Sequence, residues 1–187
     1  MLRTVSAETP TTEASFRELY DRHRREVFGF LVRLLRDEAL AEDVLQETFL
    51  RVYRALDQYD PERSFRAWIF QIARNAAVDA LRLARKEDKL REASARHQDG
   101  ASPDVVPEVS RREDAERTRG ALDDLPPDAR ALLLQRHGLG MSIAELSESW
   151  SVTERTVMNR LKGAVLLLAR ALVDRGRSPE PETGGAQ

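Results

Sequence analysis

A line of polar side chains and one aromatic ring recurs at helical spacing between residues 68 and 82. Indole rings stack on unpaired bases, amide groups form hydrogen bonds with base edges, and arginines bind phosphates. Residues 63 to 86 contain six basic residues and one acid, Asp79. The pattern favours contact with unpaired or partly opened nucleic acid; the alternatives are a core position for the ring and a solvated charged face. The line and the arginines beside it are Trp68, Gln71, Asn75 and Arg82, with Arg74 and Arg85.

A second group of polar side chains lies on the outward side of a helix that we expect after Thr153. Arginine and asparagine suit base edges in the major groove, whereas lysine and threonine suit phosphates. The preceding helix begins with a capping box, Ser142 with Glu145, and ends at Ser151-Val152. So short a turn predicts a helix-turn-helix, with an ordinary helical hairpin as the alternative. The outward residues are Glu154, Arg155, Met158, Asn159 and Lys162.

A third group combines acids with one leucine on a single helix face. At about 100° per residue, Asp43, Glu47 and Arg54 fall on one side, with Gln46 at the edge and Leu50 in the middle. A leucine among acids suits the anchor of a protein interface, and a solvated face with one stray leucine fits equally well. The opposite, buried side is predicted to hold Leu45, Phe49, Val52, Tyr53 and Leu56.

Helices must position all three groups. Apolar residues recur at helical spacing from Phe16 to Leu35, and Asp37 is a good N-cap for a helix over 38–56. Ser64 is the expected cap of a helix from Phe65 to about Arg85. A prolyl pair, Pro126-Pro127, precedes a helix over 128–137. The third helix should bury Phe65, Ile69, Ile72, Ala76 and Leu83, and the helix-turn-helix should bury Ile143, Leu146, Trp150, Val152, Val157 and Leu161.

The expected fold is all-α, with two small helical domains joined by a flexible linker, the second a helix-turn-helix. Apolar content is low between residues 91 and 116, where acids outnumber bases seven to four. We therefore predict a disordered N-terminus over 1–12, a first domain over 13–90, a linker over 91–116, a second domain over 117–174 and a disordered tail over 175–187.

The amino-acid composition limits the classes of function that the chain can have. The chain has 187 residues, a net charge of −2, no cysteine and three histidines in unrelated settings. We expect no enzyme, no metal site and no cofactor, because metal spacing and a phosphate-binding glycine loop are also missing. The apolar run that includes Val165 to Ala169 is too short to cross a bilayer. The N-terminus lacks the core of a signal peptide, so we expect a cytoplasmic protein without membrane insertion.

In their order, these segments resemble the extracytoplasmic-function (ECF) group of sigma factors in the sigma-70 family. The stretch AEDVLQETFLRVYR at residues 41–54 resembles the helix that docks on RNA polymerase. The stretch FRAWIFQIARN at residues 65–75, followed by Asp79 and Arg82, resembles the helix that meets the −10 promoter element. The stretch LDDLPP at residues 122–127 and the helix-turn-helix resemble the domain that reads the −35 element.

The resemblance implies a factor that binds core RNA polymerase and directs promoter recognition and DNA opening. Its implied partners are core polymerase, promoter DNA and an anti-sigma factor. The polymerase contacts would be Asp43, Gln46, Glu47, Leu50 and Arg54. The loop 57–64 would receive an extruded base, and the −10 contacts would be Tyr59, Arg63, Trp68, Gln71, Arg74, Asn75, Asp79 and Arg82. The −35 contacts would be Thr153, Arg155, Thr156, Met158, Asn159 and Lys162.

The second domain departs from the family pattern. Members commonly carry a small residue and then glycine where this chain has Ser147 and Ser151, and glycine where it has Arg155. Basic residues are common where this chain has Met158 and Gly163. We therefore expect fewer phosphate contacts and an altered base preference. The rival hypothesis, a stand-alone helix-turn-helix regulator, explains this domain but neither the acidic face nor the Trp68 line.

Overall fold

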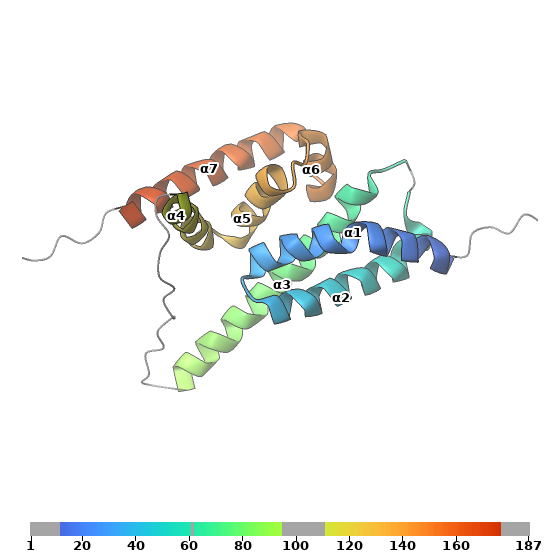
Figure 1. The fold of residues 1–187 in the computed structure, drawn as a ribbon, viewed down its shortest axis with the longest axis horizontal. Coiled ribbons are helices and arrows are strands. Elements are labelled where there is room, and N and C mark those ends of the chain that lie inside the picture. Colours follow the sequence, from blue (N-terminus) through green and yellow to red (C-terminus); the bar gives the residue numbers. More distant parts are fainter. Residues whose placement is uncertain (1–11, 61, 95–110, 177–187) are drawn as a thin grey trace, which may run out of the picture.

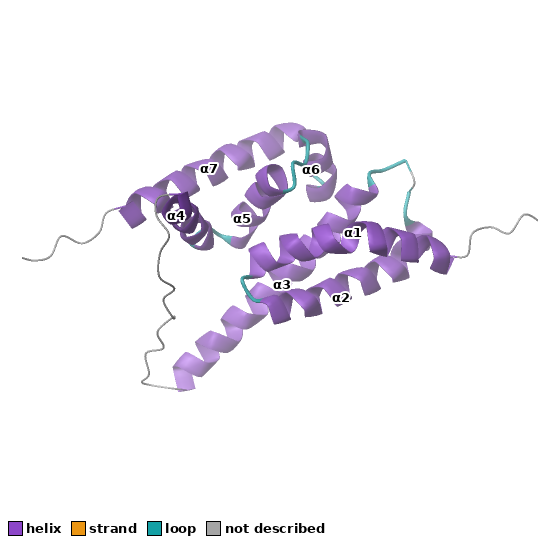
Figure 2. Ribbon diagram, in the orientation of Figure 1, coloured by secondary structure: helices purple, strands orange, loops and turns teal. Residues whose placement is uncertain are grey.

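Helices form both blocks of the chain (Figure 1). The computed structural model describes residues 12–60, 62–94 and 111–176. In the first block, α1 (Thr12–Leu35), α2 (Glu38–Ala55) and α3 (Phe65–Ser94) pack against one another, and a short 3-10 turn, η1 (Leu56–Gln58), follows α2. The expected all-α fold is confirmed, since Figure 2 shows only helices and loops among the described residues.

The second block contains four α-helices within its described residues. They are α4 (Arg111–Asp123), α5 (Pro127–Leu133), α6 (Ile143–Trp150) and α7 (Glu154–Gly176). The long α7 packs against each of the other three. A π-helical turn, η2 (Leu134–Gly138), leads from α5 towards α6.

Side-chain caps fix where several helices begin, as the sequence predicts. Asp37 accepts a hydrogen bond from the Leu40 N–H at 3.0 Å, and Ser64 accepts one from the Ala67 N–H at 3.2 Å. At the start of α6, both halves of the Ser142–Glu145 capping box form. Each cap supplies a partner to a backbone N–H that the first helical turn leaves unpaired, so these starts are set locally.

The main hydrophobic core joins the two blocks. Phe30, Phe70 and Val52 of the first block and Met141 and Leu146 of the second are fully buried in a single cluster. A smaller cluster around Leu125, Leu133 and Ala164 lies within the second block. Because α3 packs directly against α6, the two blocks form one closed arrangement in place of two separate bodies.

Two predicted core residues are exposed. Tyr53 is 49% exposed, with its ring edge-on to Phe16 at 5.1 Å, and Leu83 is 59% exposed. Both occupy the apolar stripe of their helix, but each lies beyond the part that a neighbouring helix covers. The predicted interior of the helix-turn-helix is confirmed, since Leu146 and Val157 are buried in the main core cluster and the other four residues are partly buried against it.

The predicted helix over 128–137 is interrupted. The α-helix ends at Leu133, and the chain continues as the π-helical turn η2, in which the Leu139 N–H bonds to the Leu134 carbonyl. The turn directs the fully buried Gln135 towards the first block, where its amide donates to the Phe70 carbonyl at 3.5 Å. Gly140, with φ of +65°, then reverses the chain into α6.

The helices extend into the predicted linker from both sides. The third helix ends at Ser94 instead of near Arg85, and α4 begins at Arg111. The centre of the predicted linker, 95–110, lies outside the described residues, as do 1–11 of the predicted N-terminus and 177–187 of the predicted tail. The domain boundaries stay a prediction.

Candidate functional site

The acidic face of α2 is open to solvent. The opposite side of the helix is buried through Val44, Phe49 and Val52. Asp43, Gln46 and Arg54 are exposed, and Leu50 lies between them with 49% of its surface exposed. Glu47 is half-buried and accepts a hydrogen bond from Arg51 Nε at 2.7 Å. An apolar side chain framed by acids on a rigid helix has the form of an interface anchor for a protein partner with basic groups.

Three aromatic rings surround the start of α3. The ring of Tyr59 stacks on that of Trp68 with centroids 4.9 Å apart, and Phe65 meets both rings edge-on. The Tyr59 hydroxyl donates to the Arg63 carbonyl, which closes the loop between the two. Burial raises the pKa of Tyr59, and Asp60 acts in the same direction. Trp68 is half-buried and packs against the core, as the alternative interpretation expects, and its stacking on a base stays a prediction.

Two members of the polar line on α3 face the second block. Gln71 Nε2 donates to Ser151 Oγ at 3.0 Å. Arg74, only 8% exposed, lies with its guanidinium carbon 4.0 Å from the centroid of the Trp150 ring. Its Nε and Nη2 atoms donate to Asn75 Oδ1 at 3.2 and 2.8 Å. The sequence predicted both residues as DNA contacts, and in this arrangement α6 covers them.

The remaining members of the −10 group are accessible. Arg63, Asn75, Asp79 and Arg82 are exposed. Arg82 and Asp79 form an i,i+3 ion pair at 3.4 Å. Along the chain, these exposed residues lie on both sides of Gln71 and Arg74, which α6 covers. The predicted −10 surface is therefore divided while the two blocks are together.

The outward residues of α7 are free to meet a ligand. Arg155, Met158, Asn159 and Lys162 are exposed, as is Thr153, which caps the helix by accepting from the Thr156 N–H at 3.3 Å. Half-buried Thr156 also shares a hydrogen bond with the Thr153 hydroxyl at 2.9 Å. The turn before α7 is closed by Ser151 at φ 51° and ψ 44°, the left-handed conformation that glycine adopts most readily. This geometry is that of a helix-turn-helix whose second helix can enter a major groove.

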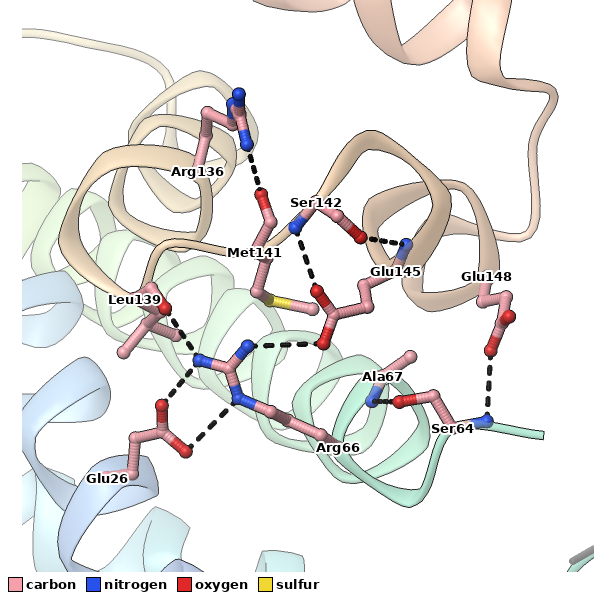
Figure 3. Close-up of polar contacts among 10 residues, drawn as sticks. All are labelled: Glu26, Ser64, Arg66, Ala67, Arg136, Leu139, Met141, Ser142, Glu145 and Glu148. Atoms are coloured by element: carbon pink, nitrogen blue, oxygen red, sulfur yellow. Dashed lines mark hydrogen bonds and ion pairs between the residues drawn. The ribbon is translucent and has the colours of Figure 1, made fainter.

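An arginine that sequence reasoning did not single out joins the two blocks. Figure 3 shows Arg66 of α3 between Glu26 of α1, Glu145 of α6 and the Leu139 carbonyl. The distances are 2.5 Å to Glu26 Oε1, 3.2 Å to Glu145 Oε1 and 2.6 Å to the Leu139 oxygen. The hydrogen bond to Glu26 raises the pKa of Arg66, so it keeps its charge. We call these four groups the Arg66 latch.

A second set of polar contacts supports the latch. Glu148 accepts from the Ser64 N–H at 3.2 Å (Figure 3), and Trp150 Nε1 donates to the buried Gln135 Oε1 at 2.6 Å. The sequence offered one partial signal for the latch, since Arg66 belongs to the basic stretch 63–86. Its partners lie 40 to 79 residues away along the chain, beyond the reach of local pattern reasoning.

A helix-turn-helix with an exposed second helix, attached to a helical bundle, is an architecture typical of proteins that bind DNA. Family models agree with this class: Sigma-70 region 2 matches residues 19–87 and Sigma-70 region 4 matches residues 115–168. No helix among the described residues is long and apolar enough to cross a membrane.

Relatives of known family extend over most of the chain. RNA polymerase sigma factor CarQ of Myxococcus xanthus is 40% identical over 133 residues, 71% of this chain and 74% of CarQ. ECF RNA polymerase sigma factor SigL of Mycobacterium tuberculosis (strain H37Rv) is 33% identical over 174 residues, 92% of this chain and 97% of SigL. The chain therefore belongs to the ECF sigma factors of the sigma-70 family, and the family resemblance is confirmed.

Two solved structures of similar fold are complexes of two proteins. CnrH with the cytosolic domain of CnrY matches with a TM-score of 0.60 and 26% identity, over 87% of this chain and 90% of CnrH. RpoE with the anti-sigma factor NepR from Bartonella quintana matches in fold with a TM-score of 0.64 and 19% identity, over 85% of this chain and 97% of RpoE. The stand-alone regulator is not favoured by these findings.

Proposed function

We propose that the chain divides the work of a sigma factor among three surfaces. As a member of the family, it binds core RNA polymerase and directs promoter recognition and DNA opening. The acidic face of α2 would dock on the polymerase, the exposed part of the α3 line with Tyr59 and Arg63 would contact the −10 element, and the outward side of α7 would read the −35 element. We infer that it does so in the cytoplasm and without catalysis of its own.

The observation that carries the docking assignment is the exposure of Leu50 on a helix whose opposite side is buried. Because single exposed leucines are common on protein surfaces, the exposure of Leu50 supports an interface only together with the acids around it. Basic groups on the polymerase would pair with Asp43 and Glu47 around a leucine that becomes buried on binding. Such an arrangement concentrates binding energy in one residue and orientation in its neighbours.

The test is binding to purified core polymerase. Leu50→Arg, or charge reversal of Asp43 and Glu47 together, should leave helicity unchanged and weaken core binding by about 2 kcal/mol or more, as the loss of an interface anchor does. Leu83→Arg is the matched control, since Leu83 on α3 is 59% exposed, against 49% for Leu50. Normal core binding by a folded Leu50→Arg protein would overturn the assignment.

We also propose an anti-sigma factor as a partner. Two of the structures that share this fold hold a protein with a partner, and in one of them the pair is named as the sigma factor RpoE and the anti-sigma factor NepR. Co-purification with a tagged chain, followed by mass spectrometry, should identify a protein that prevents core binding in a reconstituted assay.

A further inference from the structure

A cleft between the two blocks gathers four arginines. It measures about 470 Å³, within the range of small-molecule sites. Arg51 comes from α2, Arg74 and Arg82 from α3, and Arg160 from α7. Asp79 and Asp128 are the acids of the lining, so four cations and two anions leave a formal charge of +2.

The four arginines differ in how well they are paired. Arg51 bonds to Glu47 at 2.7 Å and Arg82 to Asp79 at 3.4 Å. Arg74 and Arg160 lie instead against the Trp150 ring, with guanidinium carbons 4.0 and 5.7 Å from its centroid. Among the described residues, neither of these two forms an ion pair with a carboxylate.

Arg74 is incompletely paired in this structure. Its Nε and Nη2 atoms both donate to the neutral Asn75 amide, and its Nη1 atom is buried without an acceptor among the described residues. Burial lowers the pKa of Arg74 to about 10; Asp128 opposes this shift and Arg160 adds to it. The guanidinium is therefore charged at neutral pH, and a buried charge without a counter-ion is costly.

We propose that this cleft binds a small phosphate anion with two or more charges, held by Arg74 and Arg160 from opposite sides of the domain boundary. The planar guanidinium fork matches phosphate oxygens, and phosphate would supply the negative charge that Arg74 and Arg160 lack as ion-pair partners. Because the lining is positively charged, an anion fits the cleft better than a neutral ligand, and an anion with more than one negative charge fits best. The anion could be a free polyphosphate or the phosphate chain of a nucleotide.

Such a ligand would stabilise the closed arrangement. Its contacts come from α3 of the first block and from α7 of the second, so the complete site exists only while the blocks are together. A ligand that binds one arrangement alone shifts the equilibrium towards it. The inference goes beyond the proposed function because it concerns the free protein, in which Arg74 is covered and unavailable to a promoter.

The test is a titration of the full chain in phosphate-free buffer. Pyrophosphate should raise the midpoint of thermal unfolding and change tryptophan fluorescence, more than sodium chloride or sulfate at equal ionic strength. Adenosine and guanosine triphosphates form separate arms: affinity equal to that of pyrophosphate identifies the phosphate chain as the ligand, and tighter binding identifies a nucleotide. A pyrophosphate effect no larger than that of chloride would overturn the proposal.

Two variants separate this site from general charge effects. Arg160→Gln should weaken pyrophosphate binding at least tenfold, while Arg170→Gln, exposed on the same helix but outside the cleft, should bind as the parent does. Equal binding by Arg160→Gln and the parent would also overturn the proposal. Core-polymerase binding, measured on the same proteins, should be unchanged, so failure here is distinguishable from failure of the docking assignment.

Discussion

At the scale of single residues, His23 is a titratable group that the fold keeps neutral. Its ring lies on α1 against Phe65, with centroids 5.2 Å apart, and its Nδ1 atom is buried without a partner among the described residues. Burial lowers the pKa of His23 below its usual 6.5, against the attraction of Glu26. As pH falls below about 6.5, the unfolded chain therefore takes up a proton before the folded chain does.

The consequence is a loss of stability between about pH 6.5 and the lower pKa of the folded state. Its slope should be a fraction of ~1.4 kcal/mol per pH unit, the limit for one group, because the ring is partly solvated. Urea unfolding at several pH values measures it. His23→Gln should flatten the dependence in this window, and His137→Gln, at an exposed position, should not. A His23→Gln protein with the parent's slope would contradict the explanation.

Base reading should reside in two residues of the recognition helix. Arg155 and Asn159 are exposed and about one helical turn apart on α7. Alanine at either position should cost roughly 1–3 kcal/mol on the preferred −35 duplex and relax the preference at particular base pairs. Lys162→Ala should instead weaken all duplexes and reduce the salt slope by about one. Anisotropy titrations with permuted duplexes distinguish these outcomes, and uniform weakening by Arg155→Ala would exclude a reading role.

At the scale of elements, the helix-turn-helix contains a strained turn. Ser151 adopts the left-handed region, which costs an L-residue about 1 kcal/mol or more. Ser151→Gly should therefore raise the free energy of unfolding by about 0.5–1 kcal/mol, after the greater entropy of unfolded glycine is subtracted. The change also removes the Ser151 hydroxyl that accepts a hydrogen bond from Gln71. Serine and glycine at position 151 should therefore be compared in proteins that also carry Gln71→Ala. A stability decrease in that background would show that the turn is not strained.

Local chemistry explains which elements could be predicted. The caps at Asp37, Ser64, Ser142 and Thr153 lie within three residues of the N–H groups they pair with, so the sequence alone reveals them. The π-helical turn η2 could not be predicted, because Gln135 is drawn towards α3 by a carbonyl 65 residues away. Tyr53 and Leu83 show a related limit, since periodicity predicts the apolar side of a helix but not how much of it a neighbour covers.

At the scale of the molecule, the closed arrangement is incompatible with the proposed contacts of α3 with the −10 element and of α7 with the −35 element. The −10 and −35 elements lie about 25 base pairs apart by name, on the order of 80 Å of duplex at 3.4 Å per base pair. In this structure Ser151, which caps the end of α6 in the turn before α7, is hydrogen-bonded to Gln71 of α3. The two blocks must therefore separate before both elements can be read.

The Arg66 latch should control that separation. Arg66→Met keeps the aliphatic stem but removes the bonds to Glu26, Glu145 and Leu139, a loss of about 1–3 kcal/mol. The radius of gyration of the free protein, measured by X-ray scattering, should rise. Arg22→Met is the control, since it removes an exposed ion pair within α1. An unchanged radius of gyration in Arg66→Met would contradict this prediction and would show that the shared apolar core is enough to hold the two blocks together.

The sequence predicts which site residues share one face of a helix, but it does not predict how those faces lie relative to one another in the folded protein. Helical spacing is enough to group Asp43 with Leu50, or Arg155 with Asn159, because each group lies on one helix. It gives no information on which faces meet, so the covering of Arg74 by Trp150 required the tertiary structure. The packing of the two domains against each other could not be predicted for the same reason.

The π-helical turn has an evolutionary consequence. Such a turn holds one residue more than an α-helical turn, so it corresponds to a single inserted codon. Deletion of one residue from η2 would let α5 continue as a regular helix, and everything after it would rotate by about 100° and shift by about 1.5 Å. Gln135, which the turn directs at α3, would then face elsewhere. A lineage could thus loosen or tighten the closed arrangement by a one-codon deletion or insertion, while the bases recognised by α7 stay the same.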